Sequence, residues 1–472
     1  MKKIYTTAKY KERHKRKLVK LEKKFPRRRK RLHSLKVGFE KYKSDVRRKN
    51  RDVDFSNFPL YQFLQKGRLK QKPNYSDTIK YFVENKSVFG RNDMTFEDNI
   101  IAIPEIFSII ENYTETTIFL RKLFNALYNQ SFEEIFIDYQ NCKEIDVCAS
   151  MCMDIILADF ITYYNQCSKD RHTVKVQSIK PINYNRYEIE KILFSIGAYK
   201  NIKGFNITFD NIIPFPIKIG HKDNPRLSEK REVDITQTVD YIISCLAKLN
   251  KRLTDSAETN FYKVIGEVIQ NAEEHSNTKA RYLIGHFEEN KNGSNDYGVF
   301  NLAILNFGNT FYETFKNAEN PNKAVIEQME SLSKKYTTNG LFKRKKFEEE
   351  TLWTLYALQD GVTRIKDWNR GNGAIRFIES FISLKGNIQT DNISKMVITS
   401  GHTRIIFDGK YQITKQKRGS EEKEFKMMTF NTMGDIEQLP DENYVVYEEN
   451  YFPGTIISVK LKLDYENTTN LS

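Results

Sequence analysis

Cysteine is scarce in this sequence: the chain has five among 472 residues, and none of them forms a CxxC pair. A reduced, cytoplasmic protein without structural disulfides fits this number best. Cys148 and Cys152 lie four residues apart and could share a helix face. Zinc sites usually present tighter ligand pairs, so we interpret both as small, buried core thiols.

Long apolar runs and a secretory signal are also lacking. We find no stretch that approaches the ~18 apolar residues of a membrane span, and the chain is charged from Lys2 onward. We therefore expect a soluble protein with no membrane partner. Since 39% of the residues are hydrophobic and 13% aromatic, packed cores can form, and the length suggests two or three domains.

Positive charge is concentrated in an arm at residues 1–50. This segment holds 22 Lys/Arg against 4 Asp/Glu, so it accounts for the whole formal charge of +15 and leaves the rest slightly acidic. Its cations could bind phosphates, and its interleaved aromatic residues could stack on bases. The arm therefore predicts a nucleic-acid contact; a solvated arm resting on an acidic surface is the alternative.

The middle of the chain predicts a connector, a small α/β domain and a linker. Residues 51–130 are expected to be mixed and largely helical, and residues 211–234 carry the Pro and Gly of a linker. Residues 131–210 alternate strand and helix patterns. The expected strands are Ile135–Tyr139 and Val174–Ile179, and the expected helices are Asp146–Tyr164 and Tyr187–Ile196.

This order of elements resembles the STAS fold of anti-sigma-factor antagonists. Ile137–Asp138 and Ile145–Asp146 match the family signature, but the phosphorylatable Ser that should follow is Val147, and Ser150 lies a helical turn too late. The resemblance implies a docking unit for a protein partner that is not itself a phospho-switch. An unrelated small α/β domain is the alternative.

The C-terminal half begins with two helices that carry the first candidate site. Residues 235–253 are periodic, and the next helix, capped at position 254 or 255, contains GEVIQNAEEH. Glu267, Asn271 and His275 recur every four residues and share one face, while apolar residues form the other. An Asn carbonyl is a suitable oxygen ligand for Mg²⁺, and a carboxylate one turn away can act as a general base.

Three further short motifs follow in order. A hairpin of two strands runs into Asn306-Phe307-Gly308. Arg370-Gly371-Asn372-Gly373 opens a helix, where backbone N–H groups suit phosphate oxygens. The chain closes with Phe452-Pro453-Gly454-Thr455 and an alternating strand.

Together these four motifs resemble the GHKL superfamily of type II topoisomerases, the heat-shock chaperone, histidine kinases and mismatch-repair ATPases. The resemblance covers residues 235–465 and implies an α/β (α+β) chain with a Bergerat-type sandwich that binds ATP and Mg²⁺. By position, it implies that Glu267 is the catalytic base and that Asn271 ligates magnesium. The other implied cofactor-binding residues are His275, Asn306, Gly308, Arg370, Gly371, Gly373 and Thr455.

Asn306 departs from the family, which places Asp there to accept a hydrogen bond from the adenine amino group. An Asn carbonyl also accepts but lacks the charge, and the amide can flip and donate. We therefore expect weaker adenine recognition or relaxed base selectivity; a degenerate domain that binds no nucleotide is the alternative. The lid position between Gly308 and Gly371 carries Lys343–Lys346, Arg364 and Lys366, which could meet the γ-phosphate or simply be solvated.

The sequence leaves three functions open. A histidine kinase is disfavoured because the helix at 235–253 has no phospho-accepting His. The favoured prediction is an ATP-binding regulatory protein, with or without slow hydrolysis, that switches the STAS-like unit and the arm. The alternatives are an anti-sigma-type Ser/Thr protein kinase acting in trans and a non-enzymatic nucleotide-binding adaptor. By resemblance, a homodimer is expected.

Overall fold

The computed structural model describes most of the chain beyond residue 75. Residues 75–165 and 174–472 form one compact unit. The basic arm and the small-domain segment at 170–175 lie outside the described residues. The described ranges are 76–84, 98–128, 132–169, 178–197, 207–291, 296–317, 322–337, 347–362, 373–384, 391–417, 424–464 and 470–471, with a few isolated positions.

A five-stranded antiparallel sheet, here called the large sheet, organises the C-terminal half. Its strand order is β10-β13-β9-β8-β6. The strands are β6 (Ile212–His221), β8 (Ser276–Asn290), β9 (Tyr297–Gly308), β10 (Lys395–Phe407) and β13 (Val445–Asp464). Strand β9 is buried on both faces over most of its length. Because side chains alternate along a strand, Phe300, Leu302 and Ile304 of β9 all point to the same side of the sheet.

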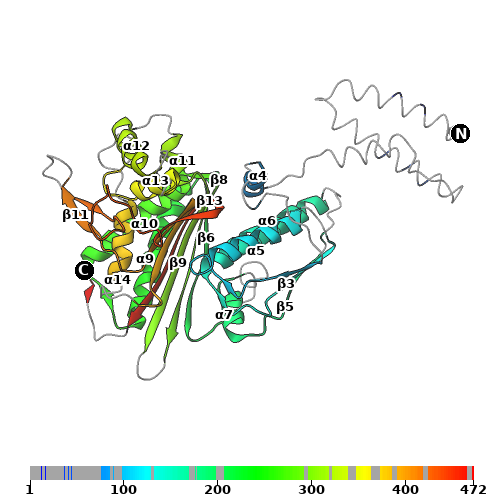
Figure 1. Ribbon diagram of the computed structural model, residues 1–472. Helices are drawn as coiled ribbons and strands as arrows, with labels where there is room; N and C mark the ends of the chain where they lie inside the picture. The colour runs from blue at the N-terminus through cyan, green and yellow to red at the C-terminus, as the bar shows by residue number, and fades with distance from the viewer. Residues whose placement is uncertain are drawn as a thin grey trace. The chain divides into compact units, whose positions relative to one another are not determined.

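Three helices cover that side of the large sheet, as Figure 1 shows. They are α9 (Leu227–Lys248), α10 (Asp255–Glu274) and α14 (Gly373–Leu384). The Thr254 side chain accepts a hydrogen bond from the Ala257 N–H, which confirms the predicted cap of α10. The apolar stripes of the helices and the strands' inner side chains form one hydrophobic core.

Shorter elements fill the segment between β9 and α14 and the insert after β10. The first segment forms α11 (Phe311–Lys316), α12 (Lys323–Thr337) and α13 (Glu349–Ala357), and α13 packs on β10 and β13. The insert contains the hairpin β11 (Thr414–Lys417) and β12 (Glu424–Met427). A short parallel pair joins β7 (Arg252–Leu253) to β14 (Asn470–Leu471).

A second, parallel sheet lies in residues 98–197, which we call the small unit. Its strands are β1 (Ile100–Ala102), β3 (Glu134–Asp138) and β5 (Ser178–Ile182), in the order β1-β3-β5. A two-residue pair, β2 (Ile106–Phe107) and β4 (Glu144–Ile145), accompanies them. The helices are α5 (Tyr113–Tyr128), α6 (Val147–Lys169) and α7 (Tyr187–Ser195), and α4 (Asp77–Glu84) precedes the unit.

The small unit contacts the face of the large sheet opposite to α10. Lys460 Nζ lies 2.8 Å from Glu144 Oε1, and the Tyr113 hydroxyl donates to the Asn450 carbonyl at 2.6 Å. Lys191 of α7, nearly fully buried, pairs with Glu288 of β8. The large sheet is therefore buried on both faces, and much of this second contact is polar.

Two predicted boundaries are wrong. The predicted linker at 211–234 is instead edge strand β6 and the start of α9, because Ile212 and Phe215 are buried against the core despite the nearby prolines. An edge strand tolerates those prolines, since one side of its backbone needs no ladder bonds. The connector predicted over 51–130 contains β1 and β2, so the small sheet begins about thirty residues before the expected boundary.

Smaller differences follow from local geometry. Strand β10 is continuous through Gly401, where its pairing with β13 has a register irregularity. The second strand of the small unit lies at Ser178–Ile182, a few residues later than predicted. The helices expected at Asp146–Tyr164 and Tyr187–Ile196 are confirmed as α6 and α7.

Helix α6 corrects the statement that no apolar run approaches a membrane span. Its window Val147–Asn165 is long and apolar enough by composition, but 72% of that window is buried inside the protein. Core helices of soluble proteins pass the same test. Cys148 and Cys152, on this helix, are free and buried, as predicted.

Candidate functional site

One stripe of α10 carries the predicted magnesium and base residues. Asn260 donates to Ser380 Oγ of α14 at 2.8 Å, and Glu267 and Asn271 lie seven and eleven residues further on. At 100° per residue these three positions fall within about 20° of one direction, so Glu267 and Asn271 project from the side of α10 that faces α14. Asn271 is exposed and Glu267 half-buried, so both are available to a ligand.

The Asn306–Gly308 motif, at the end of β9, packs against the turn that follows α10. The His275 carbonyl accepts a hydrogen bond from the Asn309 N–H at 3.1 Å, and Ser276 is the ladder partner of Gly308. A Cβ at Gly308 would lie 2.2 Å from the His275 carbonyl oxygen. Gly308 is therefore required for close packing of β9 on the turn after α10. His275 contacts this motif through its backbone carbonyl and is the C-cap residue of α10.

A row of four side-chain positions crosses the large sheet beside this turn. Arg281 pairs with Asn306, Asn306 with Thr455, and Thr455 with Ser400. Counting by two from the core residues Leu283, Ile304, Ile457 and Ile398 places all four on the helix-covered side. The row thus joins the predicted Asn306 and Thr455 to two residues that the sequence did not single out.

Asn306 is a buried amide within this row. It is only 4% exposed, and its Nδ2 is buried without a hydrogen-bond partner among the described residues. A buried amide donor left unpaired costs about 1–3 kcal/mol, so a ligand or water that accepts a hydrogen bond from it would be stabilised at this position. By contrast, Thr455 Oγ1 and Ser400 Oγ lie 2.8 Å apart and satisfy each other.

Gly454 allows Thr455 to approach the Asn306 strand. Its φ is +151°, and a Cβ there would lie 2.1 Å from the Asn306 carbonyl oxygen. No side chain fits this space, because the neighbour is backbone and cannot rotate away. The Gly454-Thr455 motif is thus fixed directly beside Asn306.

Arg281, the first residue of the row, belongs to a buried ion network. Arg281, fully buried, donates from Nε to Glu273 Oε1 at 3.1 Å and from Nη2 to Asp234 Oδ2 at 2.6 Å. Arg231 and Lys230 complete the network from α9. It ties the last turn of α10 to α9 and β8, opposite the stripe of Asn271. The Arg281 Nη1 atom has no partner among the described residues.

A second group of polar contacts lies around the Gly308 carbonyl. The Tyr81 hydroxyl of α4 donates to it at 3.0 Å, and burial is the main reason that the pKa of Tyr81 is raised. Glu313 caps α11 through a capping box with Thr310 and accepts a hydrogen bond from Tyr451 at 3.1 Å. Element α4, which comes from outside the predicted nucleotide domain, therefore contacts its first glycine motif.

Part of the predicted site belongs to segments outside the described residues. Arg370, Gly371 and the cationic lid residues at 343–346, 364 and 366 lie outside the described residues. Gly373 is the first residue of α14, as the motif predicts. In the described chain, no group of three or more His, Cys, Asp or Glu side chains could hold a metal ion.

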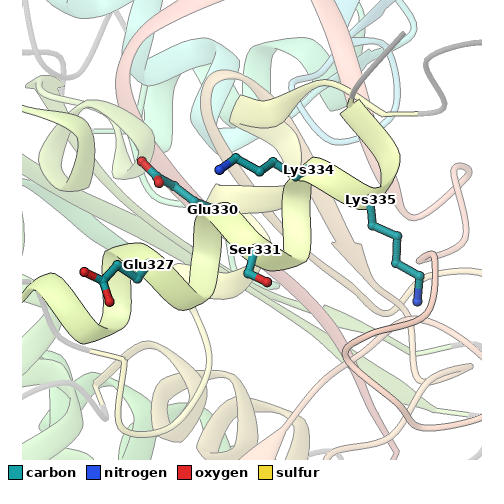
Figure 2. Close-up of a pocket in the computed structure, with 5 residues that line it drawn as sticks. All are labelled: Glu327, Glu330, Ser331, Lys334 and Lys335. Carbon is teal, nitrogen blue, oxygen red and sulfur yellow. The ribbon is translucent and has the colours of Figure 1, made fainter. Parts of the chain in front are cut away.

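Two hollows are lined mainly by residues of the segment between β9 and α14, and their charged side chains do not form a phosphate site. One, of about 310 Å³, is lined by Tyr312, Thr337, Tyr447 and the run Glu348–Glu350, and these carboxylates would repel a triphosphate. Burial raises the pKa of Glu350, which accepts a hydrogen bond from the His402 N–H. The other, of about 590 Å³, runs along α12, and Figure 2 shows its charged side chains projecting from that single helix.

No protein-family model, curated protein or solved structure gives a match to this chain. The candidate site is therefore argued from its geometry alone. Sequence reasoning missed Arg281 and Ser400, although counting by two along the strands would have placed each on the same face as the core. It also missed Tyr81, for which the sequence offers no signal, because its partner is 227 residues away.

Proposed function

We propose that the chain is a nucleotide-binding regulatory protein of the GHKL type, in which Mg-ATP on the helix-covered side of the large sheet changes how the opposite side holds a STAS-like small unit. One observation carries the proposal: the predicted site and the small unit lie on opposite faces of the same strands. Asn306 and Thr455 belong to the site, while Phe307 and Lys460 of the same two strands contact α4 and the small unit.

Support for nucleotide binding comes from the convergence of three separated motifs. His275, at the end of the first motif, accepts a hydrogen bond from the Asn309 N–H beside Gly308, and Gly454 and Thr455 pair with Phe307 and Asn306. The buried Nδ2 of Asn306 lacks a partner among the described residues. In this proposal Asn271 supplies one oxygen to Mg²⁺, whose remaining ligands are phosphate and water. Glu267, one turn earlier, is placed to receive a proton from a water or a substrate hydroxyl.

Support for coupling comes from α4. Tyr81 bonds the Gly308 carbonyl, and Phe82, fully buried, meets Phe307 edge-on at 4.9 Å between ring centroids. At the other end of the helix, Ser76 donates to Asp159 of α6 at 2.9 Å. A nucleotide that shifts the Gly308 loop therefore acts on an element bonded to the small unit.

The small unit has the character of a docking unit. The Asp146 carboxylate accepts hydrogen bonds from the Ala149 N–H at 2.6 Å and from Ser108 Oγ at 2.5 Å, so it caps α6. Ser150 is fully buried. Neither residue is presented to a kinase, so we propose that a protein partner binds this unit without phosphorylating it there.

Hydrogen exchange with and without Mg-ATP tests the proposal. We expect slower exchange at the ends of α10 and β9 and a change in α4 and α6 of the small unit. Tyr81→Phe should keep nucleotide affinity within about threefold but remove the α4 and α6 response, since it deletes one neutral hydrogen bond. Tyr262→Phe, a half-buried tyrosine on α10, is the matched control.

Two results would contradict the switch. Nucleotide binding without any exchange change in the small unit would instead favour an adaptor. Transfer of radiolabel from γ-labelled ATP to a protein hydroxyl, without free phosphate, would instead favour a protein kinase.

A further inference from the structure

Three ion pairs among the described residues join the small unit to the face of the large sheet opposite to α10. They are Lys395–Glu111, Lys460–Glu144 and Glu288–Lys191, each written with the sheet residue first. In the first two, which we call the ionic contact, the N–O distances are 2.7 and 2.8 Å, and the four side chains are 22–43% exposed. Solvent and dissolved ions therefore reach the ionic contact.

The two sheet lysines of the ionic contact lie next to each other. Lys395 and Lys460 are direct ladder partners on β10 and β13, and like charges at opposed positions destabilise a sheet. Their row continues through Asn301 to His286 and contains no carboxylate. The negative charges that pair with both lysines come from the small unit. This row of the sheet is therefore suited to receive carboxylates, and the small unit supplies them.

The third ion pair is more buried, but its separation leaves no buried lysine without a partner. Lys191 is 1% exposed and pairs with both Glu288 of the sheet and Glu188 of its own helix α7. When Lys191 leaves Glu288, it keeps Glu188. A buried charge that loses its only partner would be costly. The position of one lysine between two glutamates therefore permits this end of the small unit to separate from the sheet.

Aromatic packing holds the other end of the same strands. Phe307 lies six residues after Asn301 on β9, which is about 20 Å along the strand on the same face. Its ring meets Phe82 of α4 at 4.9 Å between centroids, and Phe82 meets Phe124 of α5 at 5.6 Å. All three rings are at most 3% exposed. This contact depends on apolar burial, which does not weaken when charges are screened.

We infer that the ionic contact is the releasable end of the small unit: it separates from the sheet while the aromatic end stays packed. A partly exposed ion pair contributes little free energy and is screened by salt, whereas each buried phenylalanine contributes much more. The inference rests on the proposed switch of the small unit and names the contact that the switch changes. The small unit rotates about α4 and does not leave the sheet.

Cys148 is a native reporter of this separation. It lies in the first turn of α6, is fully buried, and lies beside Ser458, two residues before Lys460 on the same face of β13. Its labelling by a maleimide, located by mass spectrometry, therefore requires the ionic contact to separate. Cys245 of α9, buried in the main hydrophobic core, is the internal reference for global unfolding.

Maleimide labelling of the full chain without nucleotide, below and above ~0.1 M salt, tests the inference. At high salt the rate of Cys148 labelling relative to Cys245 should rise about threefold, because the ion pairs are screened. Glu144→Lys should raise this ratio roughly tenfold at low salt, since repulsion replaces an ion pair. Addition of Lys460→Glu to that variant should restore the ratio to within about threefold of the unmodified chain.

Two controls separate release of one end from other effects. Glu105→Lys is the matched variant: Glu105 pairs with Lys143 of the same unit, so the labelling ratio should not change. Hydrogen exchange in α4 should stay unchanged at both salt concentrations and in every variant, because the aromatic end stays packed.

The outcomes separate the inference from the proposed function. A ratio that neither salt nor Glu144→Lys changes overturns the inference, as does an equal response to Glu105→Lys. Faster exchange in α4 together with faster Cys148 labelling also overturns it, because the whole small unit would then separate. If Glu144→Lys fails to fold, the salt comparison of the unmodified chain decides alone. A ratio that responds to salt but not to Mg-ATP overturns the proposed switch and supports the ionic contact as the releasable end.

Discussion

Acidification should weaken the fold through one histidine at the back of the large sheet. His286 is 5% exposed and lies opposite Asn301, whose Nδ2 is 3.1 Å from His286 Nε2. Burial, followed by the charges of Lys191 and Lys460, lowers the pKa of His286 from 6.5 to about 3. The neutral ring is thus the form that the folded protein holds at neutral pH.

The sign follows from proton counting. Between pH 6.5 and 3 the unfolded chain carries a proton on this ring and the folded chain does not, so the free energy of unfolding falls as pH falls. The contribution is fully present above pH 6.5. For a folded pKa near 3, about 2 kcal/mol is lost by pH 5.

Urea denaturation at pH 7 and pH 5, for the unmodified chain and His286→Gln, measures this contribution. The unmodified chain should lose about 2 kcal/mol more than the variant over that interval. Buried carboxyls with raised pKa values, such as Asp146 and Asp159, act in the opposite direction but are common to both proteins and cancel. His221→Gln, at an exposed position on β6, is the control. Equal losses in all three proteins would refute the reasoning.

Two further predictions concern the framework of the site. Arg281→Leu leaves Asp234 and Glu273 buried with fewer partners and should lower the free energy of unfolding by about 3–5 kcal/mol. Its control, Arg226→Leu, removes an exposed ion pair and should change the free energy of unfolding by less than about 0.5 kcal/mol. Similar losses in the two variants would contradict the role of burial. Gly454→Ala should destabilise the protein by at least about 1–3 kcal/mol, because its Cβ would meet backbone at 2.1 Å. Gly266→Ala within α10 should be neutral or stabilising, since its nearest contact is a side-chain methyl at 3.3 Å and alanine favours helix; thermal unfolding of both glycine variants tests the contrast.

The elements with strong local periodicity could be predicted from the sequence. Helix α10 has an N-cap, an apolar stripe and an opposite polar face, and the structure confirms all three. The strand β9 and the start of α14 at Gly373 were also predicted, because alternation and glycine motifs are local properties.

The errors arise where tertiary contacts override local signals. In β6, Pro214 and Pro216 indicate a linker, yet pairing with β8 and burial of Phe215 make this segment an edge strand. Likewise, β1 is only three residues long and is a strand because β3 lies beside it. Its isolated sequence carries too few residues for a periodic pattern.

The candidate site likewise contains some residues that local sequence patterns predict and others that only the tertiary fold brings together. Glu267 and Asn271 follow from helical spacing, and Asn306 from the motif that it begins. The pairing of Asn306 with Arg281 does not, because it depends on which strands lie side by side, and acids from two helices hold the guanidinium. Tyr81 contacts Gly308 only through the tertiary fold.

Nucleotide binding with and without magnesium, compared between the unmodified chain and Asn271→Ala, tests the central proposal most directly. The proposed site predicts saturable binding of a purine nucleoside triphosphate that strengthens with Mg²⁺, and Asn271→Ala should remove most of that strengthening. Glu267→Ala should bind as the unmodified chain does but lose any turnover, and Lys263→Ala, at an exposed position on α10, should behave as the unmodified chain throughout. Absence of binding by the unmodified chain, or full magnesium dependence in Asn271→Ala, would contradict the assignment of this site.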